Sequence, residues 1–289
     1  MVDEAVFYLN CRTGRIYIDA TLGSGGHALR ILKDNWFIGK LIGIDWDREA
    51  ITIARERLKE YQEKTIIIQD NFANLREILK RVKIGGVDGI VLDLGVSSQQ
   101  LENAERGFSF MLEGPLDMRM DRSSGLTAFD LVNRSSLSDL EKIIRENGEE
   151  RWAKRIVRSI VFCRKKNRIR TTAELAQIIT RAIPRGCLHK KIHPATRTFQ
   201  ALRIAVNDEL SNLQRVLHDG IDLLNRGGRF CVISFHSLED RIVKTAFRNW
   251  ARGEAKALIL TPRPIAPGPE EIERNHRARS ARLRVAERL

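Results

Sequence analysis

The sequence is poor in cysteine and in long apolar runs. Its 289 residues include four cysteines, which are widely scattered and form no CxxC pair. This pattern argues against a zinc ribbon or a disulfide framework and suits a reducing compartment, so no metal site is expected. No apolar run is long enough to span a bilayer, and no basic amphipathic helix indicates a lipid surface. The first residues resemble neither a signal peptide nor a transit segment, so we expect a cytoplasmic protein.

Acidic residues are also scarce relative to basic ones. The chain has 37 Asp and Glu against 50 Lys and Arg, which gives a formal net charge of +13 at pH 7. Such an excess of positive charge indicates a polyanionic partner. In other respects the composition, with 43% hydrophobic and 30% charged residues, is that of a globular protein able to bury a sizeable core.

One glycine-rich stretch near the N-terminus predicts a ligand site. A short apolar run ends at Asp19, a turn containing Gly23, Gly25 and Gly26 follows, and a helical pattern then begins. Strand, glycine-rich turn and helix open a nucleotide-binding α/β unit, in which glycine lets the backbone approach the ligand and the helix offers free N–H groups. A second apolar strand ends at Asp45, where a carboxylate would hold a ribose diol.

The same stretch is compatible with two ligands. Gly23, Gly25 and Ala28 satisfy the dinucleotide fingerprint with Asp45 as its ribose acid, so an NAD-dependent oxidoreductase is one interpretation. A carboxylate at Asp19 would repel a pyrophosphate, because like charges repel. It would attract the ammonium and sulfonium of S-adenosylmethionine. The residues therefore favour the methyl donor over NAD without excluding NAD.

Strands and helices alternate in the two outer parts of the chain. Apolar strands that end in an acid predict a parallel sheet with its binding site at the carboxyl ends of the strands. Between 105 and 197 only helices are predicted. One long helix over 197–224 and a fifth strand over 230–236 then resume the alternation. We predict a discontinuous α/β domain, 1–104 with 198–289, interrupted by a helical domain, 105–197.

Asp93, at the end of the predicted fourth strand, is the first candidate for a catalytic residue. An enzyme that methylates an exocyclic amine needs a hydrogen-bond acceptor there, because the amine lone pair is delocalised into the ring and must be turned toward the methyl group. No cysteine lies near this strand end, which argues against methylation at a pyrimidine C5. His236 follows the fifth strand and is a second candidate.

Basic residues gather in two segments. Nine Lys and Arg and no acid lie between Arg151 and Arg170, with Trp152 and Phe162 among them, and the segment 275–289 adds five arginines. Positive charge along a helical insertion and a tail predicts contact with a nucleic-acid backbone. The residues expected to bind RNA are Arg164, Lys165, Lys166, Arg168, Arg279 and Arg282.

Seven longer motifs resemble one known family. They are the segments 19–27, 93–98, 105–110, 114–121, 193–204, 234–241 and 277–284. Together they resemble the bacterial ribosomal RNA small-subunit methyltransferases H, which methylate the N4 of a cytidine in 16S RNA. The resemblance extends over nearly the whole chain, and motifs of this length seldom match by chance.

This resemblance implies a class I, Rossmann-like S-adenosylmethionine-dependent methyltransferase with an inserted helical domain that handles substrate. The substrate would be 16S rRNA or the small ribosomal subunit. The alternatives are the NAD-dependent oxidoreductase and a non-catalytic RNA-binding assembly factor with the same fold. The family's donor-binding positions fall on Gly25, Gly26, His27, Asp45, Phe72, Asp93 and Gln100, to which the glycine-rich turn itself adds Asp19 and Gly23.

Overall fold

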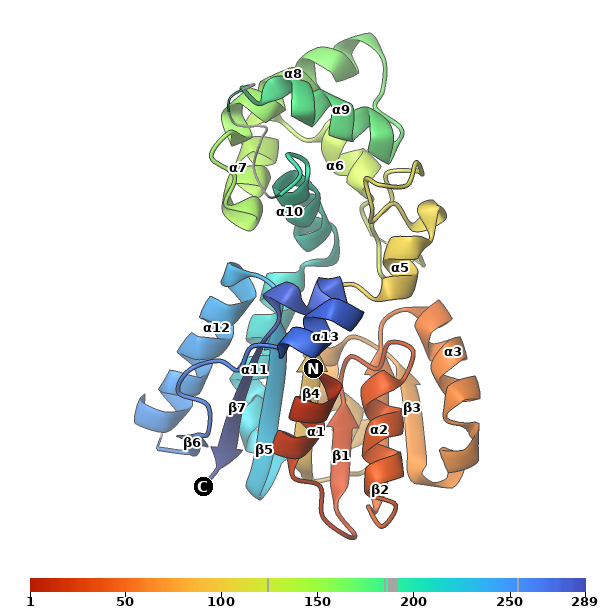
Figure 1. The fold of residues 1–289 in the computed structure, drawn as a ribbon, viewed down its shortest axis with the longest axis vertical. Helices are drawn as coiled ribbons and strands as arrows, with labels where there is room; N and C mark the ends of the chain where they lie inside the picture. The colour runs from red at the N-terminus through yellow and green to blue at the C-terminus, as the bar shows by residue number, and fades with distance from the viewer. Residues whose placement is uncertain (124, 185, 187–191, 254) are drawn as a thin grey trace. The chain divides into compact units, whose positions relative to one another are not determined.

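The chain forms two compact units (Figure 1), and the computed structural model describes residues 1–123, 125–184, 186, 192–253 and 255–289. The first unit comprises Met1–Gly95 and Leu210–Leu289, and the second comprises Val96–Glu209. The second unit is longer at both ends than the predicted insertion, 105–197. The reason is that Leu101, Phe199 and Leu202 contribute to its core.

A seven-stranded sheet organises the first unit, with the strand order β3-β2-β1-β4-β5-β7-β6. The first five strands run parallel, as the alternating pattern predicted, and β7 is antiparallel to both of its neighbours. This is the class I methyltransferase fold. The strands are β1 (Ile16–Asp19), β2 (Lys40–Asp45), β3 (Thr65–Gln69), β4 (Val87–Asp93), β5 (Leu224–Ser234), β6 (Ala257–Ile259) and β7 (Arg282–Arg288).

Helices cover both faces of this sheet. Successive strand residues point to opposite faces, so Tyr17 enters one apolar core while its neighbour Ile18 enters the other. Two buried faces explain why the parallel strands read as continuous apolar runs. One face carries α1 (Val2–Leu9), α2 (Gly26–Asp34) and α3 (Arg48–Arg57). The other face carries α4 (Leu75–Arg81), α11 (Glu209–Leu223) and α12 (Ser237–Arg248). A short helix, α13 (Pro269–Arg274), follows later in the chain.

The second unit is helical and has its own apolar core. Its helices are α5 (Ser98–Glu102), α6 (Ala128–Arg134), α7 (Leu137–Gly148), α8 (Ala153–Lys166), α9 (Thr172–Ala182) and α10 (Thr196–Asn207). Thr171 and Glu174 form a capping box at the start of α9, which explains where this helix begins. Within the described ranges, no helix of either unit combines the length and apolarity needed to cross a membrane.

The prediction of one long helix over 197–224 was wrong, because the chain breaks between α10 and α11. Asp208 has a positive φ of 49°, which ends the right-handed helix. The Asn207 side chain donates to the Arg203 carbonyl oxygen at 2.9 Å and takes up part of the hydrogen bonding of the last turn. Arg203 also forms a two-pronged ion pair with Glu209 across the break, at 2.8 Å for each contact.

The last part of the basic tail forms strand β7 of the sheet. β7 lies between β5 and β6, and its Arg284 is 6% exposed. The Arg284 guanidinium donates to both carboxylate oxygens of Asp240, at 2.6 and 3.1 Å. Burial opposes ionisation of Asp240, but the hydrogen bonds and charge of Arg284, with those of Arg282, outweigh it and lower its pKa.

We predict that Asp240→Asn destabilises the protein by about 3–5 kcal/mol, because it leaves the Arg284 charge buried without its counter-ion. Since the pKa of Asp240 is lowered in the folded state, its contribution is present above about pH 4 and is lost as the pH falls further. Urea unfolding at several pH values measures both effects. Asp222→Asn, at an exposed ion pair with Lys256, is the matched control and should cost less than about 1 kcal/mol. Equal losses in the two variants would contradict the assignment.

Candidate functional site

The glycine-rich turn between β1 and α2 adopts the backbone that the sequence predicted for a ligand loop. Gly23 and Gly25 have positive φ values of 51° and 81°, which only glycine adopts without strain. Gly25 caps α2, and its N–H donates to the Leu22 carbonyl oxygen at 2.7 Å. A Cβ added at Gly26 would meet no atom within 4 Å, so the backbone borders open space there.

Two carboxylates flank this turn at the ends of adjacent strands, one fully buried (Asp19) and one half-buried (Asp93). Asp19 ends β1 and Asp93 ends β4, and the two strands pair in parallel. Asp19 Oδ2 and Asp93 Oδ1 are both buried without a hydrogen-bond partner. Burial raises the pKa of Asp19 to about 6 and also raises the pKa of Asp93, while the nearby His27 opposes both shifts. Carboxylate oxygens kept dry and unpartnered are the acceptors that a cationic ligand requires.

His27 lies beside Asp93 in the first turn of α2. Its Nδ1 is 3.8 Å from Asp93 Oδ2, and its Nε2 is buried without a partner. Thr21 holds the same strand end, because its Oγ1 accepts a hydrogen bond from the Asp93 N–H at 2.6 Å. Sequence analysis missed Thr21, since a threonine in a turn has no signal of its own; only the pairing of β1 with β4 brings it to Asp93.

Asp45 ties the end of β2 to the glycine-rich turn. Its Oδ2 accepts from the Gly23 N–H at 2.6 Å, and its Oδ1 accepts from the Asp47 N–H at 2.8 Å. Burial raises the pKa of Asp45, although these N–H groups oppose the shift. Each oxygen retains a second lone pair, so the carboxylate can still accept hydrogen bonds from a ribose diol. Phe72 begins a short 3₁₀ turn after β3 and is half-buried against the core.

Not every strand-end acid belongs to this site. Asp70 directly follows β3, but its oxygens accept from the Asn71 N–H, the Asn74 amide and the Arg81 guanidinium at 2.8–2.9 Å. Burial opposes its ionisation, yet these donors outweigh it and lower its pKa. Asp70 is a structural residue of the turn, in contrast to the unpartnered oxygens of Asp19 and Asp93.

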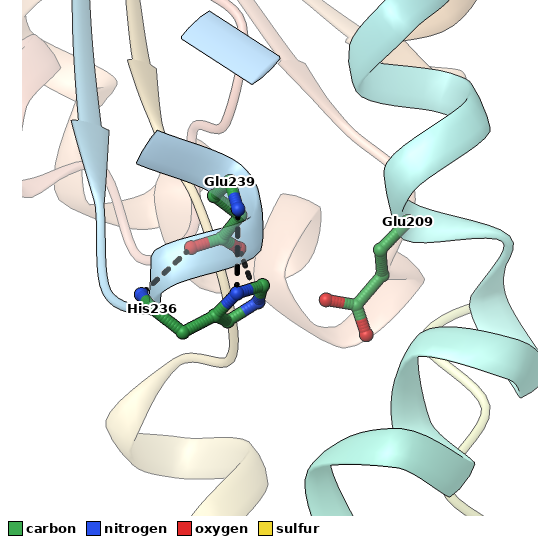
Figure 2. Close-up of side chains that lie close together, drawn as sticks. All are labelled: Glu209, His236 and Glu239. Atoms are coloured by element: carbon green, nitrogen blue, oxygen red, sulfur yellow. Dashed lines mark hydrogen bonds and ion pairs between the residues drawn. The ribbon is translucent and has the colours of Figure 1, made fainter. Parts of the chain in front are cut away.

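His236 caps α12. Figure 2 shows its ring directed at Glu239: Nδ1 accepts from the Glu239 N–H at 3.4 Å, and Nε2 lies 3.2 Å from Glu239 Oε1. The Glu239 carboxylate in turn accepts from the Phe235 and His236 N–H groups at 2.8 and 3.3 Å. These contacts form a capping box that starts the helix. The predicted catalytic role of His236 stays a prediction, and its visible role is helix capping.

Gln100 belongs to the second unit, where it is buried in a capping box at the start of α5. Its Oε1 accepts from the Ser97 N–H at 2.9 Å, and its own N–H donates to Ser97 Oγ at 3.2 Å. Its predicted contact with the methyl donor stays a prediction.

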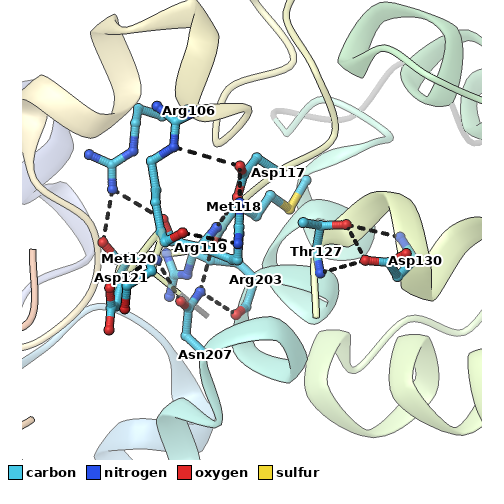
Figure 3. A network of polar contacts seen from close by, with 12 residues as sticks. Arg106, Asp117, Met118, Arg119, Met120, Asp121, Thr127, Asp130, Arg203 and Asn207 are labelled. Carbon is cyan, nitrogen blue, oxygen red and sulfur yellow. Dashed lines mark hydrogen bonds and ion pairs between the residues drawn. The ribbon is translucent and has the colours of Figure 1, made fainter. Parts of the chain in front are cut away.

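A polar network holds the loop over 117–121 in the second unit (Figure 3). Met118 is fully buried with a positive φ of 63°. The Asn207 side chain donates to the Met118 carbonyl oxygen and accepts from the Met120 N–H, both at 2.8 Å. The buried Arg106 guanidinium donates to the carbonyl oxygens of Arg119 and Met120 at 3.1 Å. Sequence analysis missed Asn207, because its partners in this loop lie more than 80 residues away along the chain.

The predicted RNA-binding residues divide into two groups. Arg164 donates to the carbonyl oxygens of Val132 and Ser135, both at 2.6 Å, and thus joins α8 to α6. Arg282 pairs with Asp240 at 3.1 Å. Arg282 is nevertheless exposed, as are Lys165, Lys166 and Arg168 in the second unit and Arg279 in the first.

Comparison with known proteins decides the family. The sequence pattern described as the MraW methylase family matches residues 1–289. The chain belongs to the MraW methylase family. The resemblance found in its motifs is thereby confirmed.

Similar proteins match this MraW methylase from end to end. The protein named ribosomal RNA small subunit methyltransferase H of Geotalea uraniireducens (strain Rf4) is 52% identical over 303 residues, covering 100% of this chain and 97% of that protein. Proteins of the same name from Syntrophus aciditrophicus (strain SB) and Halothermothrix orenii (strain H 168) are 48% and 50% identical over 303 residues. The two matches cover 96% and 97% of those proteins, respectively, and 100% of this chain.

S-adenosylmethionine is the methyl donor of this methylase, and the residues of the first unit fit it. Asp19 Oδ2 is a buried acceptor without a partner, and Asp45 holds the glycine-rich turn through the Gly23 N–H. Their predicted contacts with the donor's ammonium group and ribose stay predictions. The open space at Gly26 leaves room for a ligand beside the N-terminus of α2.

We predict that Asp19→Asn weakens S-adenosylmethionine binding by about 10- to 100-fold in calorimetric titration, the range for a lost hydrogen bond to a charged group. The same variant should stabilise the donor-free protein at neutral pH. The folded-state pKa of Asp19 is raised to about 6, so the protonated residue stabilises the wild-type fold, and this stabilisation is fully present below about pH 4. It falls as the pH rises through 6, by up to roughly 3 kcal/mol.

Asp70→Asn is the matched control for this prediction, because Asp70 is a strand-end acid with a full set of partners. It should destabilise the protein and leave donor affinity unchanged. Similar donor affinity in wild type and Asp19→Asn, or parallel pH–stability curves, would refute the role of Asp19.

Proposed function

We propose that this protein transfers the methyl group of S-adenosylmethionine to the exocyclic N4 amine of a cytidine in 16S ribosomal RNA, acting in the cytoplasm on the RNA or on the small ribosomal subunit. Full-length relatives at about 50% identity bear the name ribosomal RNA small subunit methyltransferase H. The observation that carries the proposal is the pair of buried, unpartnered carboxylate oxygens on Asp19 and Asp93.

When bound, S-adenosylmethionine supplies an electrophilic methyl group on its sulfonium. Asp19 accepts hydrogen bonds from the ammonium group, and Asp45 accepts from the ribose hydroxyls while it holds the Gly23 N–H. His27 and Thr21 keep Asp93 at the strand end, by a 3.8 Å contact and a 2.6 Å hydrogen bond. The rate then comes mainly from positioning, because no covalent enzyme intermediate is needed.

Asp93 acts on the acceptor amine in this proposal. Its Oδ1 accepts an N–H of the cytosine amine and turns the nitrogen lone pair toward the methyl group. Methylation makes the amine lose a proton, and a carboxylate whose pKa is raised by burial holds a proton more readily than an exposed one. A flipped-out base is the form of substrate that such a buried acceptor requires.

The second unit is the proposed substrate-recognition part. Lys165, Lys166 and Arg168 are exposed there and carry positive charge for phosphate contacts, as Arg279 does in the first unit. Arg164 and Arg282 contribute less in this proposal, since both are engaged within the protein. The oxidoreductase alternative has no support in a methylase family, and Asp19 would repel a pyrophosphate.

Nucleoside analysis tests the function directly. Small ribosomal subunits from cells that lack this protein should gain N4-methylcytidine in 16S rRNA after incubation with it and S-adenosylmethionine, as measured by mass spectrometry. Omission of the donor is the control. Binding to the subunit without any gain in methylated cytidine would support the non-catalytic assembly factor instead.

Asp93→Asn separates catalysis from donor binding. The substitution keeps the side-chain size and one acceptor oxygen but removes the charge. We predict a loss of about 10²- to 10⁴-fold in the single-turnover rate at saturating S-adenosylmethionine, as for a positioned polar group in other enzymes. Donor affinity should change much less. Recovery of the full rate at saturating donor would contradict the acceptor role and leave Asp93 as a donor-binding residue.

A further inference from the structure

Helix α8 presents a basic stripe to solvent. Its buried face consists of Ala153, Ile156, Val157 and Ile160, which belong to the core of the second unit. The α8 stripe is the opposite face, which we define as Arg155, Arg158, Phe162, Lys165 and Lys166. Spacings of three and four residues place these side chains on one side of the helix.

Phe162 is the single apolar residue of the α8 stripe, and its side chain is 62% exposed. Lys166 Nζ lies 4.7 Å from the centroid of its ring. Exposure of this size leaves most of the ring accessible beside the ammonium group. A single exposed apolar side chain is common on a protein surface, so the ring is informative only through the cations that surround it.

Positive charge surrounds this ring. Arg158 and Arg155 precede it by about one and two turns, and Lys165 follows it by about one turn. The described contacts provide no carboxylate partner for these three side chains, so their charge is available to a polyanion. An aromatic ring between cations matches a chain of phosphates that also carries planar bases.

We propose that the α8 stripe binds single-stranded RNA, with one base stacked on the ring of Phe162 and the flanking phosphates held by Arg155, Arg158 and Lys165. This inference rests on the proposed function, which makes RNA the substrate. Unpaired nucleotides are the fitting occupant, since the bases of an A-form duplex are stacked on one another and offer no free face. A protein-docking face would require more apolar surface than one phenylalanine.

Fluorescence anisotropy with the whole protein and a labelled oligocytidylate of about 12 nucleotides tests the stack. Phe162→Ala should weaken binding about 5- to 100-fold, the range for losing one base–aromatic stack. Phe162→Leu should lose most of this affinity, because it keeps apolar volume but has no π face, whereas Phe162→Trp should retain or increase it. An abasic oligomer of the same length should bind wild type and Phe162→Ala equally.

Lys165→Glu is the matched charge variant. It should flatten the salt dependence of binding and keep the difference between cytidylate and abasic oligomers, while Phe162→Ala should lose that difference and keep the salt dependence. If Phe162→Ala binds cytidylate as wild type does, the stack is refuted. If Phe162→Ala loses binding to vesicles that contain anionic lipid but keeps its RNA binding, the proposal is likewise overturned in favour of a membrane surface.

These results are separable from the proposed function. N4-methylcytidine formation and S-adenosylmethionine affinity report on that function, and both are measured without the oligonucleotides. Continued methylation together with unchanged RNA binding by Phe162→Ala would remove the stacking site alone. A protein that forms no N4-methylcytidine but shows base-dependent binding through Phe162 would remove the methyltransferase proposal alone.

Discussion

Carboxylate oxygens without hydrogen-bond partners, buried at the ends of parallel strands, are the constraint on which the first unit depends. Asp19 and Asp93 each keep one oxygen dry and unpartnered, which destabilises the donor-free protein. The surrounding sheet offsets this cost, since both of its faces are covered by apolar cores. The pKa of Asp19, raised to about 6, expresses the same cost as a preference for the protonated form. A cationic ligand removes the cost by supplying the missing donors.

Topology concentrates these carboxylates at one edge. Because β1, β2 and β4 are parallel neighbours, the acids that end them meet at the same edge of the sheet, where ligands bind in folds of this kind. Asp45 adds a second function there, since its hydrogen bond to Gly23 fixes the glycine-rich turn. One set of residues thus shapes the loop and offers acceptors. Asp70, with three internal donors, shows that a strand-end position alone does not make a site residue.

The second unit uses its polar groups differently. Asn207 and Arg106 satisfy backbone groups of the loop over 117–121 and hold Met118 at a positive φ. Such conformations persist only where surrounding contacts over-determine them. The α8 stripe leaves its cations exposed, whereas Arg164 on the same helix is used to join α8 to α6. Neighbouring arginines on one basic helix therefore have different roles.

The sequence alone was sufficient to predict the parallel strands β1–β5, the glycine-rich turn and the family, whereas the donor-site residues stay predictions. These features depend on local periodicity, on glycine's freedom at positive φ and on contiguous motifs. Tertiary structure alone decided that helix 197–224 breaks at Asp208, that the basic tail enters the sheet as β7, and that Arg284 is neutralised by Asp240. It also decided which acids keep an oxygen without a partner. Each of these depends on contacts between residues distant in sequence, which no local pattern encodes.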